Sequence, residues 1–157
     1  MITAIADAIK SAGARVIDVQ ADAAHNRMVV TFVAEPALAV DAAMAGAAVA
    51  TERIDLRRHR GEHPRMGAID VVPFVPFADL PMSICVDLAH DFGARLWKEL
   101  HVPVYYYGEA ARRDERRELE KVRRGGFEEL ADHITDPDRI PDEGQAELGR
   151  ASCRERV

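Results

Sequence analysis

The sequence predicts an α+β domain in which helices pack on one face of a mixed or antiparallel sheet. Segments with the spacing of amphipathic helices alternate with short β-branched runs, in the order helix, strand, strand, helix, strand, helix, strand. Two consecutive strands near the start predict a hairpin, and this order of elements is typical of a two-layer sandwich. With 157 residues and 48% hydrophobic composition, the chain fits one domain with its own core.

The first half of the chain supplies two helices and the hairpin. Apolar residues recur at helical spacing over residues 2–12, and Gly13 then predicts the end of this helix. The β-branched runs 14–20 and 27–33, separated by a polar turn, predict two strands that pair with each other. A proline in first position and a run of alanines predict a further helix over 36–55 that packs close to the sheet.

The second half adds two strands and a helix before the chain turns polar. Residues 68–77 have strand composition, but their two prolines cannot donate to a ladder and predict an edge position or a bulge. Apolar patterns predict a helix over 81–100 and a strand over 102–107. A charged helical region over 109–129, broken by a Gly-Gly pair, and a loop over 132–147 follow. Six arginines of this region alternate with acids and predict a salt-bridged, solvated face: Arg112, Arg113, Arg116, Arg117, Arg123 and Arg124.

Composition and charge exclude several classes of protein. The net charge of −6 argues against a general nucleic-acid binder. The longest apolar-looking run, 36–50, contains Asp41 and is too short to cross a membrane. Because the N-terminus lacks the features of a cleavable signal, we expect a cytoplasmic protein. Cys85 and Cys153 are too few for a disulfide framework or a metal quartet.

The segment 57–67, R-R-H-R-G-E-H-P-R-M-G, has the composition of a functional loop. Pro64 biases His63 towards an extended conformation, and the two glycines, including Gly67, allow the backbone to approach a ligand closely. Between residues 53 and 67, five arginines stand against two carboxylates. This local excess of positive charge suits a small anion, although arginines on a solvated face are the alternative interpretation.

Five sequence blocks carry a resemblance to a known family. The run G-E-H-P-R-M-G at 61–67, followed by A-I-D-V-V-P-F-V-P, resembles the active-site segment of the formiminotransferase domain of glutamate formiminotransferase. Four other blocks agree with this family in order and spacing: D-x-x-H-N-R at 22–27, T-F-V at 31–33, P-V-Y-Y-Y-G-E-A-A at 103–111 and R-R-G-G-F-E at 123–128. The resemblance covers roughly residues 2–147. It implies transfer of a formimino group from N-formimino-L-glutamate to tetrahydrofolate in histidine breakdown.

The resemblance also implies a fold and its boundaries. It places the chain in the N-terminal subdomain, a ferredoxin-like two-layer sandwich that pairs with a second subdomain to enclose the folate. Family members open with a strand and a V-P-N-F-S-E-G-like loop, so we expect the first strand to be missing and sheet edges to be exposed. We expect 1–148 to be a partial subdomain, inactive alone, and 149–157, G-R-A-S-C-R-E-R-V, to be a non-native adapter-like tail.

His63 is the predicted general acid and base. An amine of the acceptor loses a proton as it attacks the formimino carbon, and the leaving glutamate nitrogen then gains one. A side chain that titrates near neutrality suits both steps, and such catalysis is typically worth ~10²–10⁴ in rate. The family's catalytic histidine matches His63 through E-H-P-R-M-G. From residue type alone, a surface histidine before a proline would be the alternative.

The sequence does not single out one side chain that would orient the His63 ring. Glu62 is adjacent, but neighbouring side chains of an extended segment point in opposite directions. Asp18, Asp22 and Asp70 lie at predicted strand ends that could converge on the histidine. Some family members carry a carboxylate where this chain has Gln20, which can orient an imidazole but cannot relay a proton near pH 7.

Both substrates carry carboxylates, so arginine forks are expected around them. We predict Arg65, beside the proline, and Arg27, after Asn26 at a strand start, as the binding arginines. Gly67, Gln20 and Asp18 complete the predicted substrate-binding and folate-binding set. A second set of arginines is expected to supply only a general positive field: Arg57, Arg58 and Arg60.

Two other functions compete with the transferase. Residues 59–63 read H-x-x-E-H, the pattern of one class of zinc proteases, but Gly61 and Pro64 oppose the helix that this pattern requires. A formiminotransferase-like folate-binding or scaffold domain without turnover is the second alternative. We therefore expect tetrahydrofolate as co-substrate, no metal cofactor, no nucleic acid and a homo-oligomer for the full-length protein.

Overall fold

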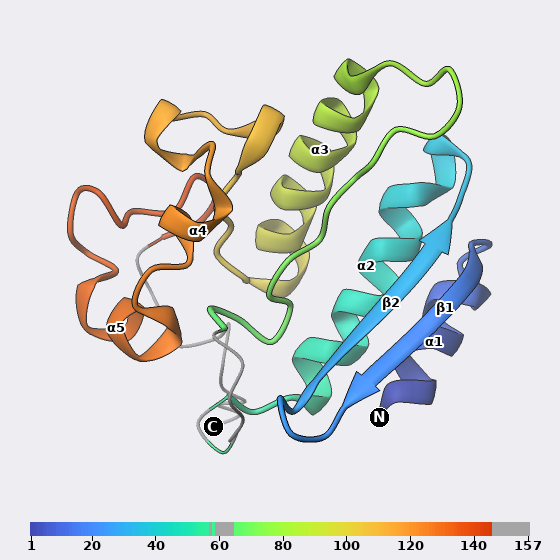
Figure 1. The fold of residues 1–157 in the computed structure, drawn as a ribbon, viewed down its shortest axis with the longest axis horizontal. Coiled ribbons are helices and arrows are strands. Elements are labelled where there is room, and N and C mark those ends of the chain that lie inside the picture. Colours follow the sequence, from blue (N-terminus) through green and yellow to red (C-terminus); the bar gives the residue numbers. More distant parts are fainter. Residues whose placement is uncertain (57, 59–64, 146–157) are drawn as a thin grey trace.

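The structure, a computed structural model, describes residues 1–56, 58 and 65–145 (Figure 1). A helix, a hairpin and two longer helices are followed by short helical pieces at the C-terminal side. The long elements are α1 (Ile2–Ser11), β1 (Arg15–Asp22), β2 (Arg27–Val33), α2 (Pro36–Arg53) and α3 (Met82–Leu100). The short ones are two 3-10 turns, Gly108–Ala110 and Asp114–Arg116, and the helices α4 (Leu119–Val122) and α5 (Gly126–His133). No helix in the described part of the chain has the length and apolar character needed to cross a membrane.

The hairpin is antiparallel and pairs Arg15 with Val33 at one end and Asp22 with Arg27 at the other. A register shift between Val16 and Asp18 leaves Ile17 as a bulge residue. Because side chains alternate along a strand, the hairpin has two chemically different faces. The structure thus confirms the predicted pairing of the first two strands.

Helices α1 and α2 cover one face of the hairpin (Figure 1). Ile5 and Ile9 of α1 pack with Ala42 and Ala50 of α2, and Val16, Met28, Val30 and Phe32 of the hairpin pack against them. The opposite face of the hairpin has no such cover among the described residues, and Ile17, Val29 and Val33 are exposed there. Helices on one face of antiparallel strands confirm the α+β class.

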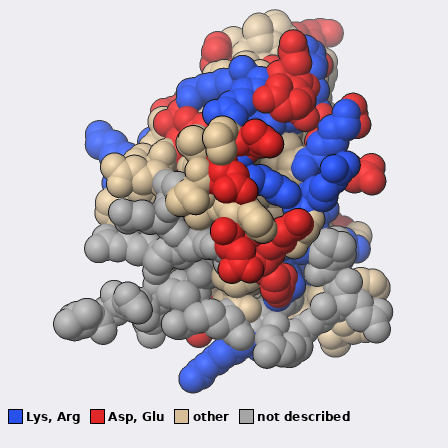
Figure 2. Space-filling view, turned by 90° about the vertical axis from the view of Figure 1, so that its left-hand side faces the viewer, with Lys and Arg blue, Asp and Glu red and all other residues tan. Residues whose placement is uncertain are grey.

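The C-terminal region contains many ion pairs. Figure 2 views the molecule from the side of α4 and α5 and shows basic and acidic side chains interleaved over this face. One prediction for the region is wrong, because Arg116 is buried rather than solvated and pairs with Asp142 at 2.8 Å. The spacing of charges along 109–129 could not reveal that the chain returns at 138–142 to enclose this arginine.

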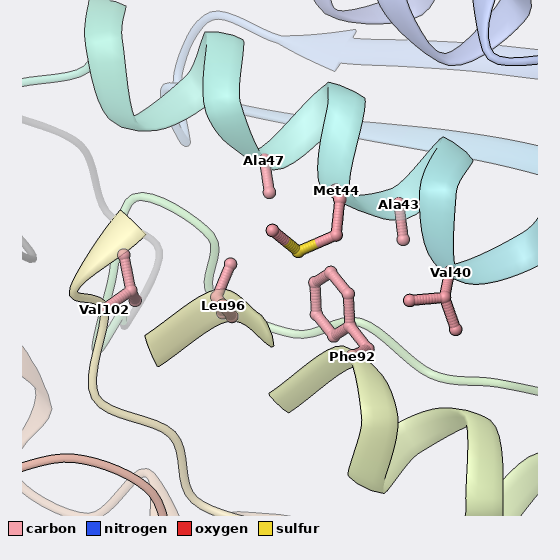
Figure 3. Close-up of a cluster of buried hydrophobic side chains, with 7 residues drawn as sticks. All are labelled: Val40, Ala43, Met44, Ala47, Phe92, Leu96 and Val102. Carbon is pink, nitrogen blue, oxygen red and sulfur yellow. The ribbon is translucent and has the colours of Figure 1, made fainter. Parts of the chain in front are cut away.

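A second apolar cluster joins α2 to α3 (Figure 3). Val40, Ala43, Met44 and Ala47 lie at the spacing of one helix face and point towards Phe92 and Leu96 of α3. Partly buried side chains of the segment that follows the functional loop pack against the same cluster: Ile69, Val72 and Phe74. This segment therefore belongs to the core between the two long helices.

The two later strands were predicted wrongly. Neither 68–77 nor 102–107 forms a strand, and the sheet of the described residues ends at β2. Residues 102–107 contribute only an isolated bridge between Val104 and Glu143. Pro73 and Pro76 have no backbone N–H to donate to a strand ladder. Within the described residues, the sheet contains only β1 and β2, so 68–77 has no strand to pair with. The ferredoxin-like arrangement with a missing first strand stays a prediction.

The helices in the charged region 109–129 are shorter than predicted. The region consists of two 3-10 turns and α4, and the predicted break at the glycine pair is confirmed, because Gly125 caps α5 in a left-handed conformation at φ 79°. Helix α5 then continues to His133, slightly into the predicted loop. The two glycines turn the chain so that α5 can contact Arg65.

Candidate functional site

Of the predicted catalytic segment, residues 61–67, the structure describes Arg65, Met66 and Gly67. His63, Glu62, Arg57 and Arg60 lie outside the described residues, as does the H-x-x-E-H pattern at 59–63. Within the described residues, no group of three or more histidines, cysteines and carboxylates is arranged to hold a metal. The geometry available for the site is therefore that of its C-terminal side and of the hairpin.

Arg65 forms a two-pronged ion pair with Glu128 of α5. Nη2 donates to Oε1 at 2.8 Å and Nη1 to Oε2 at 3.4 Å. The Arg65 side chain is 15% exposed, whereas that of Glu128 is 67% exposed, so the arginine is the anchored partner. The fork that we predicted to bind a substrate carboxylate faces a carboxylate of the same chain. A substrate carboxylate would have to replace Glu128 to use it.

Asp70 ties the residues after Arg65 to the C-terminal region. Its Oδ1 accepts a hydrogen bond from the backbone N–H of Met66 at 2.7 Å, and its Oδ2 pairs with Nη2 of Arg123 at 2.7 Å. The backbone N–H of Phe127 also donates to the carbonyl oxygen of Arg65 at 2.7 Å. Two stretches about sixty residues apart are thus joined at several points.

Gly67 lies in the bend that Asp70 closes. A Cβ at this position would lie 3.2 Å from the carbonyl oxygen of Ile69, which is closer than most side chains come to a backbone oxygen. The bend is therefore tight, as expected for a glycine where backbone approaches backbone. This observation explains the glycine without a ligand, and its predicted contact with a substrate remains a prediction.

The hairpin brings three of the predicted binding residues to one face. Asp18 and Gln20 of β1 and Arg27 of β2 lie on the face opposite the helices, because their register positions alternate with the core residues. The side-chain amide of Gln20 donates to Oδ2 of Asp18 at 2.7 Å. Asn26 occupies the adjoining turn with a positive φ of 49°, a conformation that asparagine tolerates better than most residues.

The three aspartates predicted near the histidine have separate partners. Asp22 accepts hydrogen bonds from the backbone N–H groups of Ala24 and His25 and from Nδ1 of His25. These bonds, above all that from the His25 backbone, hold the pKa of Asp22 below its ordinary value. Asp18 bonds Gln20, and Asp70 bonds Met66 and Arg123, so the described structure gives each aspartate a local role.

A cavity of about 280 Å³ lies beside Met66 and Gly67. It is lined mainly by apolar side chains of α3, α5 and the segment 69–74, and its lining also includes Asp70, Glu109 and Arg123. Tyr107 also lines it, and burial raises the pKa of this phenol, which stays protonated at neutral pH. The cavity is thus a mainly apolar space beside the end of the predicted catalytic segment, with charged side chains among its lining residues.

Sequence reasoning missed the partners that come from α4 and α5. Arg123, Phe127 and Glu128 all fall in the block R-R-G-G-F-E, which the family resemblance had singled out without assigning it a role. The interleaved charges of the region concealed them, because every arginine there has an acid nearby in sequence. Only the fold shows which acids and arginines contact the predicted catalytic segment.

The comparisons with known proteins agree with the resemblance. Residues 1–153 match the family described as the formiminotransferase domain, N-terminal subdomain. The chain is 47% identical over 155 residues to the glutamate formimidoyltransferase of Thermoplasma acidophilum, covering 97% of this chain and 51% of that protein. It is 49% identical over 145 residues to the formimidoyltransferase-cyclodeaminase of Gallus gallus, covering 92% of this chain and 27% of that protein.

A third relative is more distant. The glutamate formimidoyltransferase of Streptococcus pyogenes serotype M1 is 39% identical over 144 residues, covering 92% of this chain and 48% of that protein. The chain therefore spans about half the length of the relatives named for the transferase alone and about a quarter of the bifunctional one. By the extent of the family match, this chain belongs to the formiminotransferase domain family and corresponds to its N-terminal subdomain.

Proposed function

We propose that the protein containing this chain transfers the formimino group of N-formimino-L-glutamate to tetrahydrofolate. The observation that carries the proposal is the match of residues 1–153 to the formiminotransferase family, with G-E-H-P-R-M-G intact at 61–67. Two relatives similar over more than nine tenths of the chain are named glutamate formimidoyltransferase. We assign the reaction to histidine degradation and one-carbon metabolism in the cytoplasm, with tetrahydrofolate as co-substrate and no metal.

His63 acts as general acid and base in this proposal. It accepts the proton of the folate amine while that nitrogen forms a bond to the formimino carbon. It then donates a proton to the glutamate nitrogen as the old carbon–nitrogen bond breaks. The same proton can serve both steps, so the histidine returns to its starting state, and acid and base catalysis of this kind is worth ~10²–10⁴ in rate.

The outer face of the hairpin supplies binding groups. Arg27 is exposed there and can pair with a carboxylate of formiminoglutamate or of the folate tail. Gln20, held by Asp18, presents an oriented amide, and Asn26 lies in the adjoining turn. Arg65 joins this set only if a substrate carboxylate replaces Glu128. Gly67 lets the backbone at the C-terminal end of the catalytic segment approach the substrate.

The chain on its own is expected to be inactive, because the proposal places the folate between this subdomain and a second one. A homo-oligomer is proposed for the full-length protein. The alternative is a formiminotransferase-like folate-binding or scaffold domain, which the replacement of a family carboxylate by Gln20 favours. Gln20 would then mark the loss of the acid and base partner that turnover requires.

The proposal is tested by measuring 5-formiminotetrahydrofolate formed by the full-length protein, with and without a metal chelator. Activity that survives the chelator supports the transferase, whereas binding of folate without turnover supports the scaffold alternative. His63→Ala should lower kcat at least ~10²-fold with little change in folate affinity. His133→Ala, which removes an exposed histidine paired with Asp136, is the matched control and should leave kcat unchanged. Equal activity of both variants would exclude His63 as the acid and base.

A further inference from the structure

We propose that Asp70 and Arg123 are positioning residues that fix the backbone of Met66 and Gly67, at the C-terminal end of the catalytic segment. The inference rests on the proposed function, because it concerns the same reaction. It assigns a role in that reaction to the block 123–128, to which neither the sequence nor the comparisons gave one. The argument depends on described residues alone.

Asp70 makes two different bonds with its two oxygens. Oδ1 accepts the Met66 N–H at 2.7 Å and closes the bend 66–70, while Oδ2 pairs with Arg123 at 2.7 Å. Both side chains are 22% exposed, so the pair is partly shielded from solvent and from salt. A carboxylate that joins a backbone N–H to a guanidinium transmits the position of Arg123 directly to the Met66 backbone.

A second set of contacts fixes the residue before Met66. The N–H of Phe127 donates to the Arg65 carbonyl oxygen at 2.7 Å, and the Arg65 fork pairs with Glu128. Gly126 has a φ of 62°, and a Cβ on it would lie 3.2 Å from the same carbonyl oxygen. The turn between α4 and α5 is thus shaped to receive the Arg65 backbone.

These contacts can affect catalysis because Arg65 and Met66 are close to His63 in the sequence. His63 precedes Arg65 by a single proline, whose ring fixes its own φ, so few free torsions separate the held backbone from the reacting side chain. A displacement of ~1 Å at a reacting group can cost on the order of 10²-fold in rate. Residues that hold Arg65 and Met66 therefore control rate without contacting the substrate.

Arg117, another arginine of the C-terminal region, lacks the contacts that Arg123 makes. Arg117 pairs with Glu109 at 3.1 Å, and their side chains are 54% and 59% exposed. That pair lies within the C-terminal region and makes no bond to 65–70 among the described residues. Arg117→Met is consequently a matched control, because it removes an arginine and an ion pair of the same region.

The test is single-turnover transfer by the full-length protein, with variants Asp70→Ala, Arg123→Met and Arg123→Lys. We expect the rate constant to fall about 10- to 100-fold for Asp70→Ala and Arg123→Met. Arg123→Lys retains a cation for Asp70 and should recover most of the rate. Arg117→Met should match the wild type. A role in folding alone would lower the amplitude of the turnover, since fewer molecules react, and would leave the rate constant unchanged.

Amide hydrogen exchange of this chain supplies a readout that does not depend on activity. In Asp70→Ala the Met66 N–H should exchange faster, while the N–H of Ile54, bonded to Ala50 at the end of α2, should keep its wild-type rate. Unchanged single-turnover rate constants in Asp70→Ala and Arg123→Met would overturn the inference. A wild-type protein without transfer activity would overturn the proposed function instead, so the two failures are distinguishable.

Discussion

Replacing Arg116 with leucine should remove a large share of the stability of this chain. The Arg116 side chain is only 5% exposed, and its Nη1 lies 2.8 Å from Oδ2 of Asp142, whose side chain is 3% exposed. Nη2 of Arg116 donates to the carbonyl oxygens of Asp138 and Ile140 at 3.0 and 2.7 Å. The guanidinium also lies 5.0 Å from the ring centre of Tyr105. One side chain thus holds together three stretches of the C-terminal region.

The expected loss follows from burial. Without Arg116 the Asp142 carboxylate stays buried, with the N–H of Tyr106 at 2.9 Å as a remaining donor. Breaking a buried pair by removing one partner typically costs about 3–5 kcal/mol, because a charge is left without its counter-charge. An exposed pair such as Arg117–Glu109 contributes about 0–1 kcal/mol. Against a total stability of roughly 5–15 kcal/mol, the first loss is large and the second is small.

Urea unfolding of the 157-residue chain measures both losses. Arg116→Leu should lower the free energy of unfolding by about 3–5 kcal/mol, and Arg117→Leu, the adjacent control, by less than about 1 kcal/mol. The double variant Arg116→Leu/Asp142→Leu should lose less than the sum of the two single variants, because neither charge is then left alone. It should still lose about 1–3 kcal/mol for the Tyr106 N–H, which no longer has its acceptor.

Two outcomes would refute this reasoning. Equal losses for Arg116→Leu and Arg117→Leu would mean that burial of the pair does not determine its contribution. Additive losses in the double variant would mean that Arg116 acts through its bonds to the carbonyl oxygens and not through Asp142. In either case the buried ion pair would not be the main link of the C-terminal region.

Two further predictions concern tyrosines packed beside this pair. Gly93→Ala should lower the free energy of unfolding by about 1–3 kcal/mol, because the new alanine Cβ would lie 2.7 Å from Cε1 and 2.8 Å from Cζ of Tyr106. The control is Ala94→Gly at the exposed neighbouring position. A loss for Gly93→Ala no greater than the loss for this control would contradict the prediction. Burial raises the pKa of Tyr105 to about 12, so the folded state holds this proton more tightly than the unfolded state. Its contribution to stability should be complete below about pH 10 and lost as the pH rises towards 12, as urea unfolding of wild type and Tyr105→Phe would show.

The helices and the hairpin could be predicted from sequence because their signals are local. Helices predicted over 2–12, 36–55 and 81–100 are observed as Ile2–Ser11, Pro36–Arg53 and Met82–Leu100. Each has its apolar period, its first proline or its terminating residue within its own length. The hairpin strands likewise depend on a partner only a few residues away, across the turn at 22–27.

The strands at 68–77 and 102–107 could not be predicted in the same way. Their β-branched and aromatic composition predicted strands, whereas Ile69, Val72 and Phe74 are partly buried side chains of an irregular segment packed against the core. Burial does not require a ladder, however, and pairing depends on a strand elsewhere in the chain. A composition signal shared by strands and by irregular core segments cannot decide between them.

The contacts between the family blocks could not be predicted from the sequence. The family blocks 61–67 and 123–128 were both recognised in the sequence, yet nothing in their spacing shows that they touch. Arg65 and Arg116 have the same local appearance, an arginine among other charges, although one meets Glu128 and the other is enclosed by 138–142. Their partners are 63 and 26 positions away, beyond any local pattern.

The ion pair with Glu128 limits the ability of Arg65, in the predicted catalytic segment, to bind a substrate carboxylate. Arg65 already pairs with Glu128. A substrate carboxylate bound to Arg65 would have to displace Glu128, so the net binding free energy would be only the difference between the two ion pairs. Arg27 is exposed on the outer face of the hairpin and forms no ion pair within the described residues, so a carboxylate bound there displaces only water. Within the proposed function, we therefore assign binding of the anionic substrate to the hairpin, and positioning of the predicted catalytic segment to the contact between 65–70 and 123–128.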